Sequence, residues 1–180
     1  MNQTGILERS ILFIKARRGK PHDRLLEFIK DQKSLKKVIE IACLSTDENG
    51  KRHRHQNRIS KNNLLEFYDN VKKQINKIRN VNDFDELILI IRDQRIVGIG
   101  ELTIYDVAHR IGLFLNILPD KIYLHCGTRT GAKLILGKIS TKTILKSDLP
   151  EPLKSSDLEC WELEDLFCIR KKVFKVYKTL

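Results

Sequence analysis

Apolar residues recur at steps of three and four along most of the chain, and this spacing places them on one face of an α-helix. The clearest example follows Ser60, whose hydroxyl oxygen suits the position just before a helix. Its apolar residues are Leu64, Tyr68, Val71, Ile75 and Ile78. We therefore predict an amphipathic helix that begins after Ser60.

The same spacing predicts further helices on both sides of this one. They begin at Thr4, at Pro21, at Ser34 and at the capping-box signature Ser156-x-x-Glu159, or cover residues 84–91, 103–118 and 127–136. Hydroxyl residues at three of these starts can accept hydrogen bonds from the first free amides of a helix. Nearly the whole chain is therefore predicted to be helical.

Two segments depart from the helical spacing. Residues 140–152 contain two prolines and show little periodicity, which predicts a loop or a domain boundary. The alternation at residues 173–177 leaves a short terminal strand open as an alternative to helix. The predicted fold class is all-α, with one helical domain at residues 1–150 and a C-terminal helical appendage at residues 151–180.

Composition narrows the class of protein. Apolar residues make up 41% of the chain, which is enough for a packed core. No apolar run has the length of a membrane span and the N-terminal segment lacks the order of a signal peptide, so we expect a cytoplasmic protein with no membrane partner. The cysteines Cys43, Cys126, Cys160 and Cys168 show no zinc-finger spacing. We expect them to be free and mostly buried thiols.

The positive charge is unevenly distributed along the chain. The net charge is +11, and residues 1–80 hold 19 Lys and Arg against 9 Asp and Glu. Residues 81–180 hold 15 against 14. A one-sided positive field attracts a polyanion, so this distribution favours a nucleic-acid partner. The alternative is ordinary surface charge that keeps the protein in solution.

The segment Gly98-Ile99-Gly100 lies between two predicted helices. Glycines allow the backbone to turn sharply, and the amides of such a turn and of the next helix can face a phosphate. The candidate contacts in this segment are Gly98, Ile99, Gly100, Thr103 and Arg95. Against this, Glu101 follows the second glycine, and residues 81–112 carry a net charge of −3, from three arginines and six carboxylates.

Two further segments carry candidate phosphate contacts. The predicted loop at residues 51–58 contributes Lys51, Arg52, Arg54, His55 and Arg58, and a loop-to-helix junction after Tyr123 contributes Arg129 and Lys133. A solvated loop is the alternative for the first segment, and a buried histidine and cysteine that hold the junction in place are the alternative for the second. His53-x-His55 has no carboxylate or cysteine at a supporting spacing, so we expect no metal and no cofactor.

The segment from residue 84 to residue 112 resembles the helix-hairpin-helix motif, and residues 84–137 resemble the DNA glycosylase superfamily. The resemblance implies a helical bundle, a lysine nucleophile in the bifunctional members and a catalytic aspartate. The lysine position falls on Leu102, which has no amine, and the threonine after it is matched by Thr103. The aspartate position falls on Asp120 by counting along the chain, or on Leu124 when the later pattern is aligned. Residues 98–132 also resemble an uncharacterised bacterial family, which implies no activity.

Three functions follow from these observations. The first is a non-catalytic nucleic-acid-binding protein, with DNA favoured over RNA as the partner. The second is an enzyme on a glycosylase-like scaffold, with Asp120 or His125 as catalytic residue. The third is a protein-interaction module, such as an accessory subunit of a mobile-element or defence system, in which the hairpin is purely structural.

Overall fold

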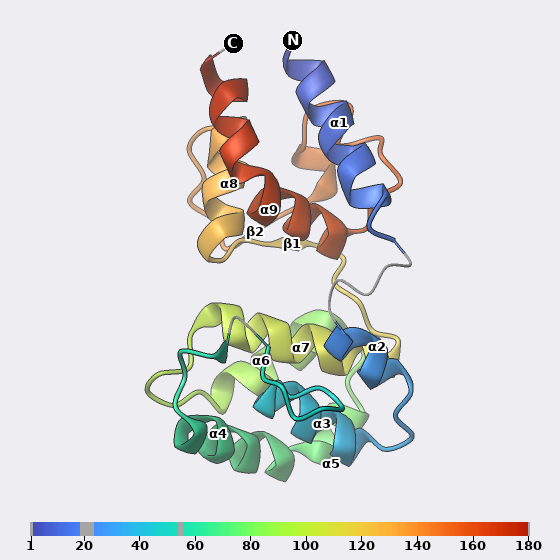
Figure 1. Cartoon of the computed structure of the whole chain (residues 1–180), viewed down its shortest axis with the longest axis vertical. Coiled ribbons are helices and arrows are strands. Elements are labelled where there is room, and N and C mark those ends of the chain that lie inside the picture. Colours follow the sequence, from blue (N-terminus) through green and yellow to red (C-terminus); the bar gives the residue numbers. More distant parts are fainter. Residues whose placement is uncertain (1, 19–23, 54–55, 180) are drawn as a thin grey trace. The chain divides into compact units, whose positions relative to one another are not determined.

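The computed structural model describes residues 2–18, 24–53 and 56–179 (Figure 1). Helices make up most of these residues, and the sheet found among them has only two short strands. The predicted all-α class is therefore confirmed. Within the described ranges, no helix has the length and apolar character needed to span a membrane.

The chain forms two compact units. Met1–Lys20 and Asp120–Leu180 form one, which we call the terminal unit, and Pro21–Pro119 form the other, which we call the hairpin unit. This division differs from the expected boundary at residue 150. The last helix packs against the first helix and against the helix that begins at Cys126, so residues 151–180 belong to a shared core.

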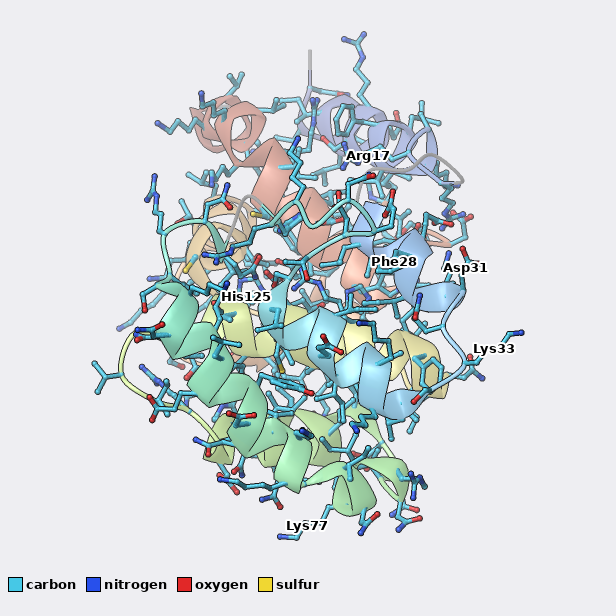
Figure 2. The ribbon with its side chains drawn as sticks, turned by 60° about the horizontal axis from the view of Figure 1, so that its bottom comes forward. Arg17, Phe28, Asp31, Lys33, Lys77 and His125 are labelled. Atoms are coloured by element: carbon cyan, nitrogen blue, oxygen red, sulfur yellow. The ribbon has the colours of Figure 1, made fainter. Side chains whose placement is uncertain are left out.

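Six helices are described in the hairpin unit. They are α2 (Arg24–Lys30), α3 (Leu35–Leu44), α4 (Lys61–Lys73), α5 (Ile75–Arg79), α6 (Phe84–Asp93) and α7 (Glu101–Leu115). Helix α3 packs against α4 and α7, and α6 packs against α7. Ile39, Phe67 and Leu87 are fully buried between them. Charged side chains such as Lys33 and Lys77 point outward (Figure 2).

Local signals set the helix boundaries in this unit. The Ser60 Oγ accepts a hydrogen bond of 3.1 Å from the Asn63 amide, which confirms the predicted start of α4. Helix α7 begins two residues before the predicted position and ends at Leu115. It ends there because Asn116 adopts a left-handed conformation with φ of 58°, which asparagine tolerates well.

The terminal unit contains helices from both ends of the chain. Its elements are α1 (Gln3–Lys15), β1 (Ile122–Tyr123), α8 (Cys126–Leu136), β2 (Thr143–Ile144), the 3-10 helix η2 (Lys146–Asp148) and α9 (Cys160–Thr179). The segment expected to be a loop thus includes a strand and a short helix. The strands pair antiparallel, with Ile122 opposite Ile144. Helix α1 runs antiparallel to α9, because the Gln3 side chain donates to the Tyr177 carbonyl while Lys15 pairs with Asp157.

Three sequence predictions in this unit need correction. Helix α1 begins at Gln3 and is capped by Asn2, not by Thr4. Helix α9 begins at Cys160, and the Glu159 amide donates to the Glu162 side chain at 2.9 Å, so the capping contact lies three residues after the predicted one. Residues 173–177 are helical, not a strand, because Phe174 stays on the buried face of α9.

Candidate nucleic-acid interface

The turn between α6 and α7 buries one side chain and exposes the backbone on either side of it. The Ile99 amide donates to the Ile96 carbonyl at 3.2 Å and closes the turn, while Gly98 takes a φ of +92°. This is the conformation that position three of a type II turn requires and that glycine adopts without strain. Ile99 is 1% exposed, whereas Gly98 and Gly100 lie on the surface.

The first turn of α4 holds this turn in place. The Asn63 side chain donates to the Val97 carbonyl at 3.0 Å. A Cβ atom on Gly98 would lie 2.5 Å from the Asn63 Nδ2, which shows how closely the two segments approach. The N-terminal ends of α4 and α7 are therefore neighbours in the hairpin unit, with the turn between them (Figure 1).

Helix α7 begins without a side-chain cap. Its N-cap residue is Gly100, in extended conformation with φ of −94° and ψ of 169°, and a Cβ there would meet no atom within 4 Å. The first amides of a helix have no partner inside the helix and carry partial positive charge. These amides start at Glu101, next to the exposed glycine. Thr103, expected to contact nucleic acid, has a buried side chain.

Charged side chains at the start of α7 partly neutralise one another. Glu101 pairs with the Arg92 Nη2 and with the Arg95 Nη1, each at 3.4 Å. The candidate contact Arg95 is therefore engaged by a carboxylate, although half of its side chain remains exposed. These three side chains together carry a charge of +1.

The loop at residues 51–58 is hydrogen-bonded to α7 through the buried side-chain amide of Gln56. Gln56 is fully buried, and its Nε2 donates to the Asp106 carboxylate at 2.7 Å. The Arg52 guanidinium donates to the Ile59 carbonyl at 2.9 Å, which fixes the path of the chain into α4. These hydrogen bonds hold the loop at residues 51–58 in the same unit as the glycine turn and α7.

The phosphate contacts predicted in the loop at residues 51–58 differ in how exposed their side chains are. Lys51 and Arg58 are exposed, as a phosphate contact requires, whereas Arg52 is half-buried and serves the loop itself. Arg54 and His55 lie outside the described residues. Lys61, at the first position of α4, is exposed, and it lies two residues before Asn63. Lys61 was not among the predicted contacts, although it directly follows the predicted cap Ser60 and therefore lies at a helix N-terminus.

The candidates Arg129 and Lys133 belong to the terminal unit. Arg129 donates to the carbonyls of Thr141 at 2.7 Å and of Ile139 at 3.4 Å. Its guanidinium therefore holds the segment after α8 in place, and this structural task corrects its assignment as a free phosphate contact. Lys133 is exposed on the surface of α8.

The two candidate catalytic residues also lie in the terminal unit. His125 is 8% exposed and its Nε2 lies 3.2 Å from the Glu164 carboxylate, which also accepts a hydrogen bond from the Thr128 hydroxyl. These contacts join the start of α8 to α9. Asp120 is exposed, and its carbonyl accepts a hydrogen bond of 3.1 Å from the Cys160 thiol.

The cysteines are all free, and their burial varies. Cys43 and Cys160 are buried and Cys168 is partly buried, and burial raises the pKa of each of these thiols. Cys126 is exposed, in contrast to the expected burial. Among the residues that the structure describes, no group of three or more His, Cys, Asp or Glu is placed to hold a metal ion.

The residues that the hairpin unit brings together come from three separate segments of the chain. They are the glycine turn with the start of α7, the first turn of α4, and the loop before α4. Exposed amides and exposed cations therefore occur in one unit. Comparison of the chain with protein-family models, with curated proteins and with solved structures finds no match.

Proposed function

We propose that the hairpin unit binds the sugar-phosphate backbone of a nucleic acid, with DNA as the partner. The amides of the glycine turn and of the first turn of α7 would receive a phosphate, and α6, the turn and α7 would form a helix-hairpin-helix motif. The observation that carries the proposal is the uncapped start of α7 behind two exposed glycines. A helix N-terminus with free amides is a favourable site for an anion.

Exposed cations near the turn support the same partner. Lys51, Arg58 and Lys61 lie on the segment that leads into Asn63, the residue that contacts the turn. Three cations that each neutralise one phosphate give a slope of about −2.7 in log Kobs against log salt concentration. We therefore expect affinity for a DNA duplex to fall roughly 40-fold between about 50 and 200 mM salt.

The proposal assigns no catalytic role to the hairpin. The resemblance to the DNA glycosylases would place the lysine position of the bifunctional members on Leu102, and leucine cannot act as a nucleophile. Binding without bond cleavage is the activity that these residues support.

Substitution of Gly100 separates binding from folding. Aspartate is a favoured N-cap residue, and Asp83 already caps α6 by accepting a hydrogen bond of 2.8 Å from the Glu86 amide. The backbone at Gly100 has the extended conformation that a cap needs, and the space around it is open. We therefore expect Gly100→Asp to fold at least as stably as the natural chain while its carboxylate lies close to the bound phosphate and repels it.

The matched control is Gly100→Asn, which has nearly the same shape and no charge. A carboxylate about 6 Å from a phosphate, at an effective dielectric constant of about 40, costs about 1.4 kcal/mol. Fluorescence anisotropy with a labelled duplex should show about tenfold weaker binding for Gly100→Asp than for Gly100→Asn. Equal affinities of the two variants, or no binding by the natural chain at low salt, would contradict the proposal.

A further inference from the structure

Helix α9 in the terminal unit has an exposed side that is both apolar and basic. Ile169, Lys172 and Val176 are exposed, and steps of three and four residues place them on one side of the helix. The opposite side, which carries Phe167 and Phe174, is buried in the core of the unit. The exposed aliphatic side chains therefore lie outside this core and are left in contact with water.

Helix α1 packs beside α9 and also exposes apolar side chains (Figure 1). Leu12 is 63% exposed and Phe13 is 37% exposed. The Arg170 guanidinium of α9 lies over the Phe13 ring, 4.8 Å from its centroid, and the Arg170 Nε donates to the Ser10 hydroxyl at 3.4 Å. These contacts join the outer side of α1 to α9.

The exposed apolar side chains of the terminal unit are concentrated on these two helices. Among the described residues of the unit, five large apolar side chains are exposed, and four of them belong to α1 or α9. Scattered single apolar residues are normal on a surface, whereas several on packed helices indicate a contact surface. We call this surface the α1–α9 face, and its residues are Leu12, Phe13, Ile169, Val176, Lys172 and Lys175.

Positive charge accompanies the apolar side chains. Residues 166–180 contain five lysines and arginines and no aspartate or glutamate. Near the start of α9, Asp157 and Glu162 both pair with Arg18, so these carboxylates are neutralised inside the unit. Among the described residues of α1 and α9, Glu8 is the one exposed carboxylate. The α1–α9 face is therefore positively charged.

An apolar surface with cations among its side chains suits a partner that offers both negative charge and an apolar layer. The backbone of a nucleic acid offers the charge alone. The cores of protein interfaces are depleted of lysine. An anionic lipid bilayer offers both, because its headgroups lie directly above the acyl chains. Long lysine and arginine side chains keep their charge among the headgroups while the apolar side chains enter below.

We propose that the α1–α9 face binds the surface of an anionic lipid bilayer. Its apolar side chains enter the boundary between headgroups and acyl chains, and its lysines contact the anionic headgroups. The proposal goes beyond the proposed function, which concerns the hairpin unit, and does not depend on it. The expectation of no membrane partner came from the lack of an apolar run long enough to span a bilayer, and a contact at the membrane surface needs no such run.

Flotation of the whole chain with lipid vesicles tests the charged part of the face. Vesicles of phosphatidylcholine with about 30% phosphatidylglycerol should bind the chain at least roughly tenfold more tightly than phosphatidylcholine alone. Each cation near an anionic surface contributes about fivefold, so the double variant Lys172→Gln/Lys175→Gln should bind about 25-fold more weakly. The matched control is Lys33→Gln/Lys77→Gln, which removes the same charge from exposed positions of the hairpin unit and should bind as the natural chain does.

A second pair of variants tests the apolar part of the face. Leu12→Gln/Val176→Gln keeps the charge and changes the two most exposed apolar side chains of the unit, so folding should be unaffected, which circular dichroism checks. Loss of their burial should weaken vesicle binding by about tenfold or more. Leu65→Gln/Leu89→Gln makes the same kind of change at exposed positions of the hairpin unit and should leave vesicle binding unchanged.

Several outcomes would overturn the membrane proposal. They are no binding of the natural chain to anionic vesicles, equal binding to both kinds of vesicle, and equal binding by the natural chain and either variant of the face. If Lys172→Gln/Lys175→Gln weakens binding to a DNA duplex but not to vesicles, the face belongs to a nucleic-acid contact and the proposal is also wrong. The Gly100 variants test the hairpin unit separately, so either proposal can fail while the other stands.

Discussion

Replacement of Gly98 by alanine should destabilise the hairpin unit, while the same replacement at Gly100 should not. Gly98 has a φ of +92°, and a Cβ there would lie 2.5 Å from the Asn63 Nδ2. Gly100 has a φ of −94° and open space around the Cβ position. The two glycines are two residues apart, so the pair compares backbone requirements within one turn.

The expected change in the free energy of unfolding is the sum of separate contributions. A left-handed backbone costs an alanine about 1 to 2 kcal/mol, and displacement of the Asn63 amide from the Val97 carbonyl costs about 1 kcal/mol. The lower entropy of the unfolded chain returns about 0.7 kcal/mol. The net loss for Gly98→Ala is then about 2 kcal/mol. For Gly100→Ala, the same entropic gain offsets the modest preference of glycine over alanine at an N-cap, so the change is close to zero.

Urea unfolding followed by far-UV circular dichroism measures both variants. Because the chain forms two units, the curve can contain two transitions. Hydrogen exchange of residues 95–105 therefore assigns the change to the hairpin, where Gly98→Ala should exchange faster. If the two variants unfold within about 0.5 kcal/mol of each other, the required positive φ at Gly98 is refuted.

Three further predictions concern other parts of the molecule. Gly131→Ala places a Cβ against the Phe167 carbonyl of the neighbouring helix, so it should destabilise the terminal unit by about 3 kcal/mol. The fluorescence of Trp161 during unfolding measures this change, and an unchanged unfolding midpoint would contradict the close packing of α8 against α9. Hydrogen bonds from a lysine and then an arginine lower the pKa of Asp157 from 3.8 to about 2, so the stability they contribute is complete above pH 3.8 and is lost as the pH falls through 2. Asp157→Asn should remove this part of the acid dependence, and acid titrations of equal steepness in both chains would refute it. Glu101→Gln frees two arginines at the start of α7, so DNA affinity should rise severalfold with a steeper salt dependence, and a loss of affinity would contradict the charge argument.

Helix positions could be predicted because they depend on local sequence. Ser60 caps α4 as its hydroxyl and the following apolar spacing indicate, and the sharp turn lies at Gly98-Ile99-Gly100 as predicted. Ile99 itself was expected among the nucleic-acid contacts, but its side chain is buried. Such signals act over a few residues, within which backbone preference and capping hydrogen bonds compete. The capping-box signature at Ser156 predicted the wrong helix start, because the capping contact lies at Glu159 instead.

The candidate site required the tertiary structure. Asn63 contacts Val97 across 34 positions in the chain, and Gln56 contacts Asp106 across 50. Nothing in the sequence near any of these residues specifies the distant partner, because a polar side chain can be satisfied by water as well as by the protein. The burial of the Thr103 side chain could not be predicted for a related reason, since it depends on which helices pack against α7.

The sequence alone determined that the chain is helical, where its main helices lie and where a sharp glycine turn occurs. Only the tertiary structure decided which helices share a core, because an amphipathic face can pack against any complementary apolar face. The assignment of helices to the two cores also decides how the charged residues are divided between the two units. The terminal unit holds 17 Lys and Arg against 9 Asp and Glu, a net charge of +8, and the hairpin unit holds 17 against 14, a net charge of +3. The basic N-terminal half of the sequence is thus divided between two cores, since α1 completes its apolar face with α9 at the far end of the chain.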